Sequence, residues 1–324
     1  MKVKQTRESF VCAGLTPTAL RYRNITGGVK VYSVCGEKVR QFTENKDYKV
    51  DGGSIVRLPS SEMPDFSKAP LYGIKKFDHE KFEKWGNAPY MLFADYEAEV
   101  PKNETTEEIA KVVAEENGNY GALGSFFASL TGETEMLVFG DSISTGCEAT
   151  TRDRAYFSLL TGAVREKYGI GLHINNKSIG GETSRNAIKR YEQVLNESNA
   201  KIMILAYGMN DQNLFGDDRA VEPSEYYANI GTVAAKAEAK GMKVVLASPC
   251  EPHPEWIHTS GRTKEYVEVL RGISRERGYA YADVNAVWKS ELKFKRADDL
   301  LNNGINHPTD YGHYIYYTAL KQLL

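Results

Sequence analysis

Four short stretches in the second half of the chain carry side chains capable of nucleophilic chemistry. Ser142 offers a hydroxyl, and His307 offers an imidazole that suits a general base near neutral pH. A backbone N–H in a glycine pair and the side-chain amide of Asn210 can donate to a developing oxyanion. The stretches read GDSISTG (140–146), SIGGETS (178–184), YGMND (207–211) and NHPTD (306–310). Together they provide the groups that a serine nucleophile requires.

Regular alternation of short apolar runs with longer amphipathic segments begins near residue 134. Buried strands are predicted at 136–140, 172–176, 201–208, 243–249 and 279–284. Helices are predicted near 154–168, 184–196, 224–240, 262–277 and 310–323. Strict alternation predicts an α/β fold with a parallel sheet and helices on both faces. Since three of the four reactive stretches directly follow strands, we expect them to meet at the carboxyl edge of that sheet.

The first 130 residues have a different texture. Strand-like pieces occur at 29–34, 48–50, 54–58 and 89–96, separated by turn signals such as DGG at 51–53. This pattern predicts a small antiparallel β unit, and the segment 104–131 reads as a helical linker. The expected organisation is a β-rich accessory domain at 1–130 followed by a catalytic domain at 131–324.

Charge and composition exclude several classes of protein. The 324 residues include 41 Lys and Arg and 43 Asp and Glu, without long blocks of one sign, so no nucleic-acid or anionic-membrane partner is expected. No stretch approaches the roughly 18 apolar residues that span a bilayer, and no signal peptide is recognisable, so a cytoplasmic location is predicted. The expected partner is a small-molecule or oligosaccharide ester.

Metal and disulfide chemistry find little support in the cysteine and histidine spacing. Four scattered cysteines without CxxC pairs read as free thiols. The stretch PCEPHPEWIH (249–258) gathers Cys250, His253 and His258, but zinc ligands usually come in tighter pairs. We interpret it as a substrate-facing loop in which Trp256 forms either a pocket wall or part of the core. No metal and no organic cofactor are expected.

The four reactive stretches, in this order, resemble the SGNH or GDSL hydrolase family over residues 136 to about 320. Ser142 matches the nucleophile block, Gly181 the glycine block, Asn210 the asparagine block and His307 the histidine block. The resemblance implies a flavodoxin-like three-layer α/β/α fold and an esterase reaction without a cofactor. It also implies an oxyanion hole formed by the N–H groups of Ser142 and Gly181 and the side chain of Asn210. Longer matches around GDSISTGCEA and NGINHPTDYGH are similar to bacterial carbohydrate-esterase-like members with an N-terminal β-domain.

One position departs from the family pattern. The triad acid usually stands three residues before the histidine, and here that residue is Gly304. Asn303, Asp299 and Asp310 are the candidates for a third triad member, and a serine–histidine pair without an acid is the remaining alternative.

The expected reaction is hydrolysis of a short acyl ester, acetyl first, on a carbohydrate. The alternatives are a lysophospholipase or thioesterase of the same family, and a non-catalytic binding protein on this scaffold.

Overall fold

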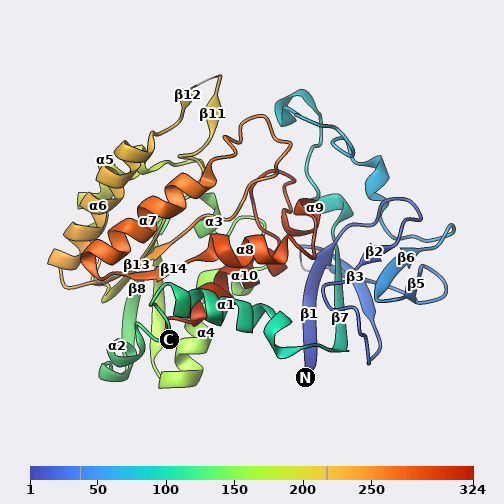
Figure 1. Cartoon of the computed structure of the whole chain (residues 1–324), viewed down its shortest axis with the longest axis horizontal. Helices are drawn as coiled ribbons and strands as arrows, with labels where there is room; N and C mark the ends of the chain where they lie inside the picture. The colour runs from blue at the N-terminus through green and yellow to red at the C-terminus, as the bar shows by residue number, and fades with distance from the viewer. Residues whose placement is uncertain (37, 217) are drawn as a thin grey trace.

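A five-stranded parallel sheet forms the centre of the second half of the chain (Figure 1). The computed structural model describes residues 1–36, 38–216 and 218–324. The strands are β8 (Glu133–Gly140), β9 (Gly171–Asn176), β10 (Ile202–Ala206), β13 (Lys243–Ala247) and β14 (Ala280–Ala282). Their spatial order is β14-β13-β10-β8-β9. Numbered along the chain this order is 2-1-3-4-5, which is the flavodoxin-like arrangement, so the predicted fold class is confirmed.

Helices cover both faces of this sheet, because alternate strand residues point to opposite sides. On one face Met136, Ile204 and Val245 pack against α4 (Tyr156–Tyr168) and α10 (Asp310–Lys321). On the other face Leu137 and Leu205 belong to a second core with three further helices. These helices are α5 (Ser184–Asn196), α6 (Pro223–Ala239) and α7 (Thr263–Arg277). The result is three layers, as expected.

The predicted strands and long helices lie where the sequence placed them, to within a few residues. The prediction was wrong at the end of the last strand, which stops at Ala282 because Asp283 caps a helix that was not expected. That carboxylate accepts from the N–H of Ala286 at 3.1 Å. The short helices missed by the sequence reading are α3 (Ser142–Thr145), α8 (Val284–Glu291) and α9 (Ala297–Leu300).

Two antiparallel sheets form the N-terminal part, which confirms the predicted β unit. The first has the order β1-β7-β3-β4 and the second β2-β6-β5. Their strands are β1 (Lys2–Phe10), β2 (Thr18–Ala19), β3 (Lys30–Cys35), β4 (Lys38–Phe42), β5 (Tyr48–Asp51), β6 (Ser54–Arg57) and β7 (Leu92–Glu99). A short ribbon, β11 (Leu214–Phe215) with β12 (Asp218–Arg219), belongs to the second half. Figure 1 shows the N-terminal sheets beside the carboxyl-terminal helices α9 and α10.

Buried ion pairs connect the N-terminal sheets to the α/β part. Lys295 Nζ lies 2.5 Å from a carboxylate oxygen of Glu8, and both side chains are fully buried. Arg21 pairs with Glu291 at 2.7 Å, again almost without exposure. Charges buried in this way must stay paired, since removal of one partner leaves an uncompensated charge. The two parts are therefore held in one relative position.

The predicted linker at 104–131 contains α1 (Thr106–Glu116) and α2 (Gly124–Ser129). Ala110, Leu123 and Phe127 are buried in the same core as α4 and α10. These helices thus pack on the α/β part, and the domain boundary at residue 130 stays a prediction.

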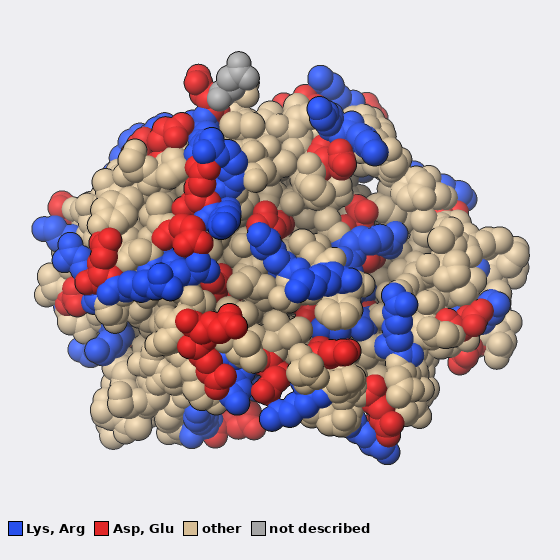
Figure 2. Space-filling model, in the orientation of Figure 1, with Lys and Arg blue, Asp and Glu red and all other residues tan. Residues whose placement is uncertain are grey.

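Among the described residues, no helix is long and apolar enough to cross a membrane. Acidic and basic side chains are interspersed on the face of the molecule that Figure 2 shows.

Candidate active site

Ser142 stands at the carboxyl end of the central strand β8, as the first residue of α3. Gly140 is required before it, because a Cβ there would lie 2.4 Å from the carbonyl oxygen of Ala206 on β10. Asp141 caps the helix by accepting from the N–H of Ile143 at 3.0 Å. Burial raises the pKa of Asp141 to about 7. The GDS sequence thus serves, in order, close strand packing, helix capping and display of the hydroxyl.

His307 reaches this hydroxyl from the loop before α10. Its Nε2 lies 2.8 Å from Oγ of Ser142, although 165 residues separate the two. Burial, with a smaller effect from His313, lowers the pKa of His307 to about 4. The imidazole is therefore neutral at pH 7 and able to accept the hydroxyl proton.

Asn303 shapes the loop that carries His307. Its Oδ1 accepts from the backbone N–H groups of Ile305, Asn306 and His307 at 2.8–3.1 Å. Its Nδ2 donates to the side chain of Asn306 at 2.9 Å. Asn303 contacts the backbone of His307 and forms no hydrogen bond with the imidazole.

The two acidic candidates have their oxygens directed elsewhere. Asp299 accepts from the N–H of Val11 at 3.0 Å and pairs with Arg296 at 2.8 Å. Burial opposes its ionisation, but Lys295 and Arg296 outweigh this and hold the pKa of Asp299 below its usual range.

Asp310 accepts from Nε of Arg7 at 2.7 Å and from the N–H and hydroxyl of Thr150 at 2.8 and 2.7 Å. The structure thus brings neither acid into hydrogen-bonding contact with His307. Within the described residues, the hydrogen bond of the imidazole is the one to Ser142.

The backbone at Gly304 explains why no acid stands there. Its φ is +74°, a conformation that side chains rarely adopt, and an added Cβ would lie 3.0 Å from Oδ1 of Asn87. Asn87 belongs to the N-terminal part and donates to the carbonyls of Leu301 and Asp298 at 3.1 and 3.3 Å. An aspartate at position 304 would need both a strained backbone and the space of Asn87. Sequence reading missed Asn87, because no local pattern marks a contact across more than 200 residues.

The glycine and asparagine stretches border the same hydroxyl. A Cβ at Gly180 would lie 3.7 Å from Cβ of Ser142, which places the glycine pair beside the nucleophile. Gly181 has a φ of +76° and open space around it. Asn210 donates one amide hydrogen to the carbonyl of Glu182 at 2.9 Å, so its second amide hydrogen stays available.

Asp211 joins these two loops from below. Its carboxylate accepts from the N–H of Ser184 at 2.9 Å and from the N–H of Gly208 at 3.1 Å. Burial raises the pKa of Asp211 to about 6. The loops after β9 and β10 are therefore fixed relative to each other, as an oxyanion hole requires.

The stretch PCEPHPEWIH does not bring its cysteine and histidines together. Cys250 is fully buried, and burial raises the pKa of its thiol. His253 lies 3.5 Å from Asp298, and Trp256 is only 5% exposed in an apolar cluster with Phe77 and Ile305. Of the two interpretations of Trp256, the structure places it in the core.

Comparison with known proteins supports this geometry. The model of the GDSL-like Lipase/Acylhydrolase family matches residues 138–315. The esterase TesA of Pseudomonas aeruginosa is 31% identical over 161 residues, which cover 46% of this chain and 77% of that protein. An arylesterase of Vibrio mimicus is 28% identical over 112 residues, covering 35% of this chain and 52% of that protein.

A solved structure also shares the fold. The acetylxylan esterase Axe2 from Geobacillus stearothermophilus has a TM-score of 0.51 and 22% identity, covering 59% of this chain and 94% of that chain.

Proposed function

Because this chain belongs to the GDSL-like lipase/acylhydrolase family and is an ester-hydrolysing enzyme, we propose that it removes short acyl groups, acetyl first, from a carbohydrate. The observation that carries the proposed mechanism is the 2.8 Å contact between Nε2 of His307 and Oγ of Ser142. The acetyl-carbohydrate substrate takes its direction from the acetylxylan esterase of the same fold.

In this mechanism His307 accepts the proton of Ser142 as its oxygen attacks the ester carbonyl. The N–H groups of Ser142 and Gly181 and the side chain of Asn210 donate to the oxyanion of the tetrahedral intermediate. His307 then protonates the departing alcohol, leaving an acyl group on Ser142. Water, deprotonated by His307, attacks this acyl-enzyme and releases the acid.

We further propose that Ser142 and His307 act as a pair, with Asn303 holding the histidine loop through the backbone. Support comes from the hydrogen bonds of Asn303, Asp299 and Asp310, all of which lead away from the imidazole. A carboxylate is therefore not needed to fix the position of His307.

Acetate release from acetylated xylooligosaccharides tests the substrate, alongside a series of p-nitrophenyl esters of increasing chain length. The proposal expects acetate release and the highest kcat/KM for the acetyl ester. A maximum at long acyl chains or on acyl-thioesters would instead favour a lysophospholipase or thioesterase. If folded protein neither hydrolyses any ester nor labels at Ser142 with a fluorophosphonate, the binding-protein alternative holds.

Asn210→Ala is expected to lower kcat by roughly 10²–10³-fold, because one oxyanion donor is worth about 2.7–4 kcal/mol in the transition state. Steady-state kinetics on p-nitrophenyl acetate measure it. The matched control is Asn213→Ala, three residues along the same loop, where the side chain accepts from Gln212. A comparable loss of kcat in both variants, or an effect confined to KM, would contradict the assigned role.

The acid limb of kcat/KM is expected near pH 4, where His307 gains a proton. Protonation removes its base function, so activity falls as pH drops through about 4 and is level above about pH 5. A carboxylate at Nδ1 would favour the charged imidazole and move the limb to about 6.5 or higher. A pH profile of the wild type decides between the two.

The control for this profile is His313→Gln. His313 lowers the pKa of His307, and its Nε2 donates to the carbonyl of Cys147 at 3.1 Å, a bond that glutamine can retain. Its removal is expected to shift the limb upward, and a shift downward would argue that another group sets the limb.

A further inference from the structure

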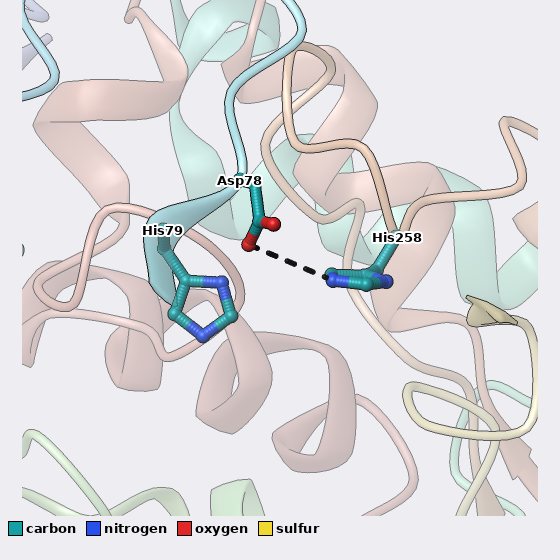
Figure 3. Close-up of side chains that lie close together, drawn as sticks. All are labelled: Asp78, His79 and His258. Carbon is teal, nitrogen blue, oxygen red and sulfur yellow. Dashed lines mark ion pairs between the residues drawn. The ribbon is translucent and has the colours of Figure 1, made fainter. Parts of the chain in front are cut away.

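A second group of side chains, which ester hydrolysis does not use, lies where the N-terminal part meets the loop after β13. Figure 3 shows Asp78, His79 and His258 directed toward one another. One ligand atom from each lies within 4.8 Å of the others, and all three residues are half-buried. Two imidazoles and a carboxylate form a donor set that suits a divalent transition metal, zinc in particular.

The backbone brings this cluster together. The N–H of Phe77 donates to the carbonyl of Glu255 at 2.8 Å, and the carbonyl of Phe77 accepts from the N–H of Ile257 at 3.1 Å. This pairing is parallel, so the next residue on each segment, Asp78 and His258, come side by side. The ligand atoms are thus positioned by hydrogen bonds that do not depend on a metal.

His258 has the tautomer that a metal ligand needs. Its Nδ1 lies 2.9 Å from the carbonyl oxygen of Leu214, to which it can only donate. The lone pair of Nε2 is then free and faces Oδ1 of Asp78 at 4.0 Å. This separation is too long for a hydrogen bond, but it fits a cation between the two atoms, since zinc bonds to nitrogen and oxygen measure about 2.0–2.2 Å.

His79 completes the set and is held in an aromatic surrounding. Its ring lies edge-on to Trp85 and Trp256, at centroid distances of 4.4 and 5.7 Å. Burial lowers the pKa of His79, so the ring is neutral at pH 7. Its Nδ1 accepts from the indole N–H of Trp256 at 3.1 Å. A metal at Nδ1 would replace that hydrogen bond, which makes Trp256 a reporter of binding.

We propose that Asp78, His79 and His258 bind one zinc ion, with a water molecule at the fourth position. The ion joins residues 77–79 of the N-terminal part to the loop that carries His258. Phe77 and Trp256 share an apolar cluster with Ile305, two residues before His307. Zinc therefore also stabilises the support of the catalytic histidine loop.

Titration of the metal-free, full-length protein with zinc chloride, followed by calorimetry, tests this site. One zinc ion per chain is expected, and Asp78→Asn and His258→Gln should each lower the affinity at least 10-fold to about 100-fold. Tryptophan fluorescence should change with zinc in the wild type and not in His258→Gln. Zinc should also raise the Tm of the wild type more than that of either variant.

The matched control is His173→Gln. His173 is exposed and pairs with Glu133 at 2.8 Å, so it is a histidine–carboxylate pair that can capture zinc adventitiously. Its replacement is expected to leave zinc affinity unchanged. The proposal fails if the wild type binds no zinc, if both cluster variants bind zinc as tightly as the wild type, or if His173→Gln alone removes binding. Circular dichroism checks the fold of each variant, and the two ligand replacements are independent of each other.

Discussion

Ser142→Ala is expected to lower kcat for p-nitrophenyl acetate by about 10⁶-fold, to the level that binding and the oxyanion donors provide without a nucleophile. The side chain of Ser142 forms its hydrogen bond with His307, and the backbone contacts of α3 do not require the hydroxyl. The variant should therefore fold normally. Steady-state kinetics and thermal unfolding, measured on the same preparation, separate loss of chemistry from loss of structure.

Ser144→Ala is the control for this variant, because Ser144 lies in the same short helix and is equally buried. Its hydroxyl bonds to that of Tyr156 at 2.8 Å and points away from His307. Loss of this bond is expected to cost about 1–3 kcal/mol of stability and little kcat. If Ser142→Ala keeps more than about 1% of wild-type kcat, a different group is the nucleophile.

His307→Gln should reduce kcat by a similar factor of about 10⁶, since a hydroxyl without a base is a poor nucleophile. The pair acts as a unit, so the double variant Ser142→Ala with His307→Gln is expected to be no slower than either single variant. Multiplication of the two losses would show that the residues act independently and would overturn the proposed pair. Kinetics at pH 7, where the imidazole is neutral, give the comparison.

His253→Gln controls for a histidine in the neighbouring loop. The backbone N–H of His253 donates to the carbonyl of Ile305 at 2.6 Å, a contact that the substitution keeps. A small effect is expected. A loss as large as that of His307→Gln would indicate that the loop, and not the imidazole of His307, limits the reaction.

Much of the fold follows from local patterns in the sequence. The buried runs of β8, β10 and β13 and the amphipathic period of α5 and α7 are strong, because each segment buries one face or both faces against its neighbours. By contrast, β1 was missed. Its buried positions carry Glu8 and Ser9 rather than apolar residues. These side chains are satisfied by Lys295, Tyr96 and Thr309, which lie far away in the sequence.

The sequence by itself determined the α/β alternation, the position of Ser142, Gly181 and Asn210 at strand ends, and the presence of His307 before a helix. It did so because burial period and turn chemistry are local properties. Only the tertiary structure decided what surrounds these residues. The contact of His307 with Ser142, the place of Asn87 beside Gly304 and the Asp78, His79 and His258 cluster each join segments more than 160 residues apart. Such contacts depend on how whole layers pack, and no pattern within one segment records them.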